Sequence, residues 1–113
     1  MSIRGIADRI GLDYDAAVEA YCGDVPALAE AIRAFPSSSG MEDLRGCIAG
    51  RRWQDARKAA HDLRKKAEKA GLGQLAHEAS LLEEVSEEKM EADFMKLDSL
   101  YGRICRIIEE EKL

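Results

Sequence analysis

Apolar and charged residues alternate with a helical period between residues 52 and 70. The apolar positions recur every three or four residues, and charged residues fill most of the positions between them. The sequence therefore predicts a helix from about Arg52 to Ala70 with one face directed to a core. This face consists of Trp53, Ala56, Ala60, Leu63, Ala67 and Ala70.

A second helix is predicted directly after this one. Gly71 and Gly73 indicate a turn, and apolar positions resume beyond it while Glu83, Glu84, Glu87 and Glu88 keep the outer face acidic. Helices joined by so short a turn must run antiparallel, so residues 52–88 are expected to form a helical hairpin. The inward positions of the second helix are Leu75, Ala76, Ala79 and Leu82, extending toward Val85.

The C-terminal segment predicts a third long helix. Its apolar residues follow one another at spacings of 4, 3, 4, 3 and 4, which is a sustained inward seam. The seam consists of Met90, Phe94, Leu97, Tyr101, Ile104 and Ile108.

The N-terminal residues predict a short strap helix. Residues 2–10 place three isoleucines on one side and stop near Gly11, so this helix is expected to lie across one end of a bundle. The isoleucines are Ile3, Ile6 and Ile10.

Two aspartates mark the starts of the next helices. Asp13 and Asp24 each precede a periodic segment and are expected to act as N-caps. The pattern after Asp24 is expected to break at Pro36–Gly40 and to resume at Met41 until Gly50.

Three long amphipathic segments and a fourth that is split at the serine-rich break predict an all-α protein. The chain of 113 residues is only 5% aromatic, and its alanine-rich seams suit closely packed helices. We therefore expect residues 1–113 to form one domain, an antiparallel four-helix bundle with the short N-terminal helices packed across one end.

Charge and cysteine usage limit the classes of function. A net charge of −5 argues against nucleic-acid binding, and charges interrupt every apolar run before it reaches the length of a membrane span. The three cysteines form no metal-ligand pattern, and no apolar leader is present, so a cytoplasmic location is expected.

The candidate for chemistry is His61, which lies one position past the buried seam. Its neighbours three and four residues away are Arg57, Lys58, Arg64 and Lys65, and all four are cationic. An accessible imidazole among cations is suited to accept a phosphoryl group and hold it transiently. The alternative is a histidine that only fills a boundary position on a helix whose outer face is basic anyway.

The predicted hairpin brings Glu83 to the height of His61. His61 lies 11 residues before Leu72, the middle of the turn, and Glu83 lies 11 residues after it. A carboxylate that accepts the Nδ1 proton would leave Nε2 as the exposed nucleophile. The alternative is an ordinary surface glutamate.

The sequence lacks the residue patterns that other kinds of active site require. Neither histidine has a glutamate three residues before it, so a metal site in the bundle core is not expected, and His77 is interpreted as a surface residue. No Gly-x-Ser-x-Gly motif or glycine-rich phosphate loop occurs. Cys47 and Cys105 are expected to be structural, and Cys22 more exposed.

These residues resemble the histidine-containing phosphotransfer (HPt) domains. That family reads roughly Ala-His-x-Leu-Lys-Gly in its acceptor helix, followed by a turn with Gly and a helix that carries Leu-Glu. The resemblance covers about residues 11–88. The matching segments are Ala60-His61-Asp62-Leu63-Arg64-Lys65, Gly71-Leu72 and Leu82-Glu83, with Gly11-Leu12-Asp13, Tyr21-Cys22-Gly23-Asp24 and Trp53-Gln54-Asp55-Ala56 upstream.

The resemblance implies a phosphoryl carrier of two-component phosphorelays that uses no ATP. His61 would receive the phosphoryl group from a receiver-domain aspartate and pass it to another receiver. Arg64 would offer its guanidinium to the phosphoryl oxygens, and Glu83 would orient Nδ1. The implied partners are response-regulator receiver domains and a hybrid sensor histidine kinase; no cofactor is expected on this chain, and Mg²⁺ only on the receiver.

One position departs from the family pattern. Lys65 replaces the glycine that clears space for the receiver. A flexible lysine could swing aside or help to bind phosphate, but the same change is expected in a domain that has lost transfer and only docks receiver or kinase partners. Both interpretations stay open, with Arg57, Lys58 and Lys65 as the residues expected to bind a phosphoryl group or a partner.

Overall fold

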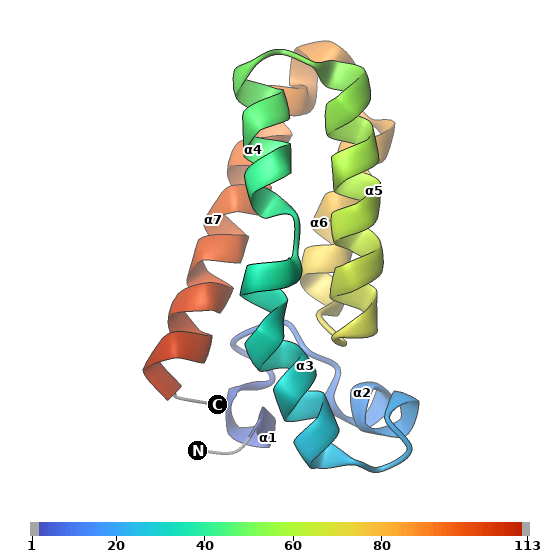
Figure 1. Ribbon diagram of the computed structural model, residues 1–113, viewed down its shortest axis with the longest axis vertical. Coiled ribbons are helices and arrows are strands. Elements are labelled where there is room, and N and C mark those ends of the chain that lie inside the picture. Colours follow the sequence, from blue (N-terminus) through green and yellow to red (C-terminus); the bar gives the residue numbers. More distant parts are fainter. Residues whose placement is uncertain (1–2, 112–113) are drawn as a thin grey trace.

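All regular structure in residues 3–111, the part of the chain described by the computed structural model, is helical. Figure 1 shows the helices in chain order. None of the helices in this part combines the length and the apolar character needed to cross a membrane. The helices are α1 (Ile3–Ile6), α2 (Tyr14–Ala20), α3 (Val25–Ser38), α4 (Met41–Ala49), α5 (Trp53–Lys69), α6 (Gly73–Glu84) and α7 (Glu87–Glu111).

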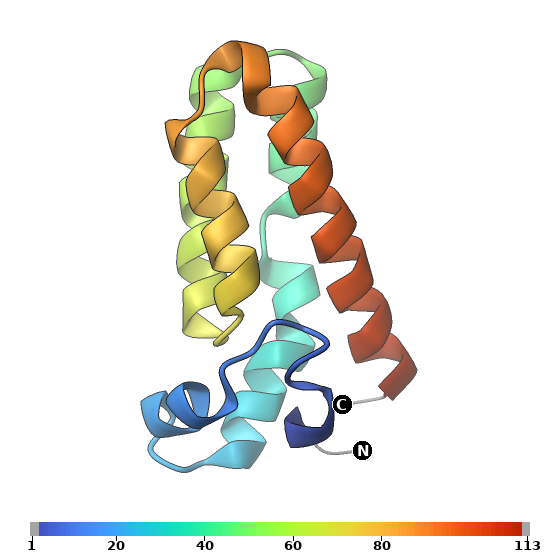
Figure 2. The same ribbon diagram turned by 180° about the vertical axis from the view of Figure 1, so that it is seen from behind.

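The long helices lie side by side along the longest axis of the molecule. α5 and α6 form an antiparallel hairpin, and α7 runs back along α6 (Figures 1 and 2). α3 and α4 follow each other along the remaining side, while α1 and α2 lie at the end where α5 turns into α6. The predicted hairpin is therefore present, but it ends at Glu84 and not at residue 88, since Glu87 and Glu88 lie in the first turn of α7.

The predicted inward seams supply most of the core. All six seam residues of α7 and the four inward residues of α6 are buried. The seam of α5 is buried from Ala56 to Ala70, whereas Trp53 at its start is only half-buried, as is Val85, which follows α6. The core is thus built mainly from alanine, leucine and isoleucine, as the composition predicts.

The strap helix predicted for residues 2–10 is wrong in extent. α1 covers only Ile3–Ile6, and residue 2 lies outside the described residues. A turn follows because the Arg9 amide bonds to the Ile6 carbonyl and the Leu12 amide reaches back to Ala7, which closes the chain on itself. The isoleucines of this segment are nevertheless all buried.

The predicted caps are confirmed, and the predicted break at Pro36 is misplaced. Asp13 and Asp24 accept hydrogen bonds from the amides of Ala16 and Ala27, at 3.3 and 3.1 Å. α3 continues through Pro36 to Ser38. One missing amide in its last turn is tolerated, and the chain breaks only at Gly40, where φ is 80°.

A buried polar cluster fixes the junction between α3 and α4. The hydroxyl of Tyr101 donates to the Pro36 carbonyl at 3.1 Å and pairs with the Ser39 hydroxyl at 2.8 Å. The Met41 amide donates to the same serine oxygen at 3.2 Å. These three hydrogen bonds satisfy the buried hydroxyls of Ser39 and Tyr101 and tie the bend to α7.

The turn between α5 and α6 rests on the N-terminal segment. The Leu72 amide donates to the Ala67 carbonyl at 2.8 Å across Gly71, whose φ of 79° is left-handed. Tyr21, the residue that caps the C-terminus of α2, donates its hydroxyl hydrogen to the Lys69 carbonyl at 2.9 Å, where α5 has no partner of its own. The N-terminal segment therefore holds the hairpin at its closed end.

Replacing Gly71 with Ala should lower the free energy of unfolding by about 2–4 kcal/mol. A Cβ at this position would lie 2.7 Å from both Ala17 Cβ and Leu12 Cδ1, in addition to the strain of its positive φ. Urea unfolding measures the change. The matched control is Gly102→Ala in α7, where a Cβ meets nothing within 4 Å and helix propensity should raise stability by about 0.5–1 kcal/mol. Equal stabilities of the two variants would contradict the tight contact at the turn.

Candidate functional site

His61 lies on α5 at the border between the core and solvent. Ala60 and Leu63 beside it are completely buried, whereas the His61 side chain is 42% exposed. Its Nδ1 lies 2.5 Å from Oε1 of Glu83 on α6. Both the boundary position and the contact with Glu83 predicted from the hairpin are confirmed.

The partner at Nδ1 determines the tautomer of His61. An ionised carboxylate only accepts hydrogen bonds, so the Nδ1 nitrogen beside Glu83 carries a proton and donates it. In the neutral ring, Nε2 then carries the free lone pair. Because the two nitrogens lie on different edges of the ring and Nδ1 faces α6, Nε2 faces away from α6.

The guanidinium of Arg64 holds the Glu83 carboxylate from its other side. Arg64 Nε donates to Glu83 Oε2 at 2.7 Å, and Nη1 donates to Glu68 Oε1 at 2.8 Å. Nη2 lies 3.0 Å from His61 Nδ1. When Nδ1 carries its proton, both nitrogens are hydrogen-bond donors, so this close approach is not a hydrogen bond. The hydrogen bonds to Glu68 and then Glu83 raise the pKa of Arg64 above its usual value.

Arg57 fixes the backbone beneath the same carboxylate. Its Nη1 donates to the Glu83 carbonyl at 2.9 Å. This carbonyl belongs to the last turn of α6, where the helix offers no amide partner of its own. Two arginines one turn on either side of His61 therefore hold Glu83, one by its side chain and the other by its main chain.

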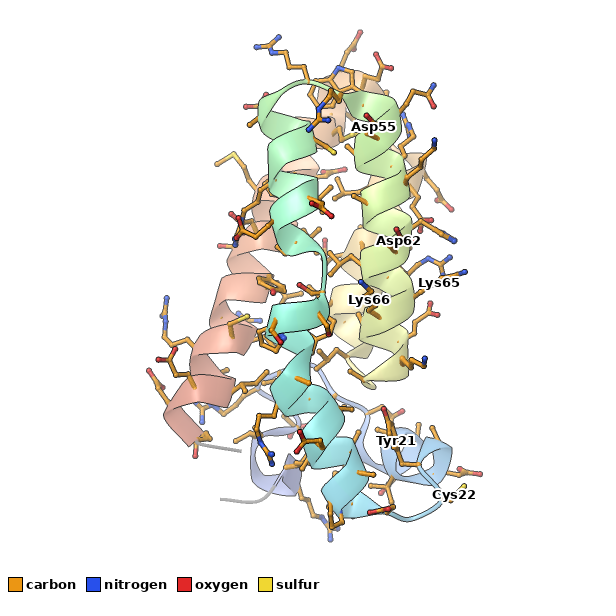
Figure 3. All side chains as sticks on the ribbon, in the orientation of Figure 1. Tyr21, Cys22, Asp55, Asp62, Lys65 and Lys66 are labelled. Carbon is orange, nitrogen blue, oxygen red and sulfur yellow. The ribbon has the colours of Figure 1, made fainter. Side chains whose placement is uncertain are left out.

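The two lysines near His61 are disposed differently. Lys58 and Lys65 are exposed, and neither makes an ion pair with any residue that the structure describes. Figure 3 shows Lys65 projecting outward from α5, away from α4, whereas Lys66 projects toward the junction of α3 and α4. The four cations around His61 thus divide into two bound arginines and two lysines in solvent.

Glu68 is a member of the site that the sequence analysis missed. It lies four residues after Arg64, the spacing at which opposite charges meet on a helix, and that spacing was the available signal. Together with Arg64 it lines a shallow groove between α5 and α6, which Ser80 and His77 border on the α6 side. His77 is exposed, as predicted; it borders the same groove as Arg64 and Glu83 but is not part of the hydrogen-bonded cluster around His61.

The cysteines lie apart from this cluster. Cys22 is exposed, Cys47 is buried and Cys105 is half-buried, and all three are free thiols. Burial raises the pKa of the Cys105 thiol, which disfavours the reactive thiolate. The greater exposure predicted for Cys22 is confirmed.

The His61 cluster contains two carboxylates and one imidazole, but Arg64 occupies the space between them. Within residues 3–111, no group of three or more histidine, cysteine, aspartate or glutamate side chains is arranged to hold a metal ion. What the cluster offers is a nucleophilic nitrogen, an orienting carboxylate and nearby positive charge. No protein-family model, curated protein or solved structure matches this chain, so inferences about its function rest on this geometry.

Proposed function

We propose that this protein is a histidine phosphotransfer protein that carries a phosphoryl group on His61 between receiver-domain aspartates. The observation that carries the proposal is the pairing of His61 Nδ1 with Glu83 across the hairpin, at 2.5 Å. A histidine that only filled a boundary position would not require a glutamate whose carboxylate is held by Arg64 and whose main-chain carbonyl is held by Arg57.

The transfer step follows from the tautomer. The Nε2 lone pair attacks the phosphorus of an aspartyl phosphate, the P–O bond to the aspartate breaks, and the aspartate leaves as a carboxylate. Nδ1 keeps its proton, so the phosphorylated ring gains a positive charge. Glu83 faces that charge directly and stabilises the product as well as the orientation of the ring. Transfer to the next receiver is the same step in reverse.

The proposed frame for this chemistry is an antiparallel four-helix bundle, in which α3 and α4 together form one member beside α5, α6 and α7. α1 and α2 pack across one end. In such a bundle the outer faces of α5 and α6 remain open to a partner, which agrees with the exposure of His61 (Figure 1). A receiver aspartate approaches from solvent and needs no pocket on this chain.

The proposed partners are response-regulator receiver domains and the receiver domain of a hybrid sensor histidine kinase. The chain itself would use no cofactor, and Mg²⁺ would belong to the receiver, where it neutralises the phosphoryl oxygens. The exposed cations Lys58 and Lys65 beside His61 provide charge complementary to the acidic phosphorylation site of such a partner.

Phosphoryl exchange with a panel of phosphorylated receiver domains tests the proposal. We expect an acid-labile phosphoryl adduct that intact-mass measurement detects and that peptide mapping locates on His61. Receiver binding without an adduct would overturn the carrier proposal. It would favour the alternative of a pseudo-phosphotransfer domain, for which the specific observation is that the bulky Lys65 lies one turn from the acceptor.

A further inference from the structure

The cations around His61 differ in whether they are available to bind a phosphoryl group. Arg57 and Arg64 already bind Glu83, one at its carbonyl and the other at its carboxylate. Arg64 also binds Glu68. For its guanidinium to reach a group on Nε2, it would have to release a carboxylate that positions the histidine. Arg64 is therefore better suited to position Glu83 than to bind the phosphoryl group.

The location of the nitrogens leads to the same conclusion. The Arg64 guanidinium lies beside Nδ1, with Nη2 at 3.0 Å. The phosphoryl group would sit on Nε2, at the edge of the ring that faces away from α6. A second cation is needed on that side to neutralise the phosphoryl oxygens.

Lys65 has the position and the freedom that this role requires. It follows His61 by four residues, so the two side chains share one face of α5. Helical side chains lean toward the N-terminus, which directs Lys65 back toward His61 and directs Lys58 away from it. Lys65 is exposed and makes no ion pair with the described residues, and it projects outward from α5 (Figure 3).

We propose that Lys65 is the residue that binds the phosphoryl oxygens on His61, and that Arg64 instead positions Glu83. This inference rests on the proposed function, since it assigns the oxygen-binding cation of the same site. In the phosphorylated state the Lys65 ammonium donates hydrogen bonds to the phosphoryl oxygens, and no ion pair of the resting site has to break. Lys65 thereby assists the acceptor histidine instead of obstructing it.

The test uses phosphoramidate, a small donor that transfers its phosphoryl group to histidine with loss of ammonia and without a receiver. The intact chain is compared with Lys65→Gln, Lys65→Arg and Lys66→Gln by following the adduct on His61 over time. Lys66 is the matched control. It is an exposed lysine one position further on, and its Nζ lies 3.9 Å from where a Gly40 Cβ would be, on the side of α5 near the α3–α4 junction.

We expect Lys65→Gln to form the adduct roughly threefold to fivefold more slowly than the unchanged protein, the size of one exposed ionic contact. Lys65→Arg should restore most of the rate, and Lys66→Gln should change it less than twofold. In 0.5 M NaCl the difference between Lys65→Gln and the unchanged protein should become smaller, because the Debye length falls to about 4 Å and exposed charges then attract each other more weakly. Equal rates for Lys65→Gln and Lys66→Gln, or a faster Lys65→Gln, would overturn the assignment of Lys65. Absence of a His61 adduct in every protein would instead overturn the proposed function.

Discussion

Replacing His61 with Gln is expected to abolish the acid-labile phosphoryl adduct completely. Glutamine is close to histidine in size and stays polar, but its amide nitrogen has no lone pair available for attack on phosphorus. The fold should be retained because the His61 side chain is 42% exposed and its hydrogen bond to Glu83 is only partly buried. The unfolding free energy should therefore change by less than about 1 kcal/mol.

His77→Gln is the matched control for this experiment. His77 is an exposed histidine on α6 and is not part of the hydrogen-bonded cluster of His61, Glu83 and Arg64, so the same substitution there should leave both the adduct and its rate unchanged. Intact-mass measurement before and after mild acid treatment distinguishes a phosphohistidine from a stable phosphoester. An adduct that persists in His61→Gln, or that disappears in His77→Gln, would contradict the assignment of His61 as the acceptor.

The contact between His61 and Glu83 could be predicted because it depends on the backbone alone. Once Gly71 and Gly73 define the turn, two residues that lie equally far from it on the two antiparallel helices lie at the same height along the hairpin. A shift of one residue would change the height by only about 1.5 Å but would rotate the side chain by about 100°, so the contact also requires both residues to lie on the facing sides of the two helices. Periodicity identified the core for the same reason, since burial on a helix depends on which face a residue occupies.

The distribution of the cations could not be predicted in the same way. In the sequence, Arg57, Arg64 and Lys65 each lie three or four residues from His61. Which group each long side chain binds depends on the carboxylates and carbonyls that lie within its reach in the folded structure. Arg64 has Glu68 on its own helix and Glu83 across the hairpin, and both bind it. Spacing alone treats the four cations as one ring around the histidine, whereas packing divides them into bound arginines and exposed lysines.

Local hydrogen bonds and turns also explain why two helix ends differ from their predicted positions. Pro36 stays within α3 because it lies near the end of the helix, and the carbonyl of Pro36 finds a partner in Tyr101 on α7. The first helix stops at Ile6 although the apolar pattern continues to Ile10, since a turn buries the same isoleucines. Apolar spacing indicates which residues are buried, but it does not distinguish a helix from a compact turn.

Replacing Glu83 with Gln should slow phosphorylation of His61 by about 10- to 100-fold, the usual effect of removing a carboxylate that orients a functional histidine. With the amide oxygen toward His61, the amide NH₂ would face the Arg64 Nε–H, and two donors would meet. With the amide reversed, its NH₂ would face Nδ1 and favour the tautomer that carries the proton on Nε2, which removes the nucleophile. In either orientation the charge that balances the phosphorylated ring is lost.

The rate with phosphoramidate and the ¹⁵N chemical shifts of the His61 ring measure the two consequences separately. Glu84→Gln is the control, because Glu84 is the next residue of α6, is exposed, and makes no ion pair with the described residues. Slower transfer in Glu83→Gln alone, together with a shift toward the Nε2–H tautomer, would connect the hairpin geometry to the chemistry. An unchanged rate in Glu83→Gln would mean that the Glu83 carboxylate, held by Arg64, serves the packing of the hairpin and not the acceptor.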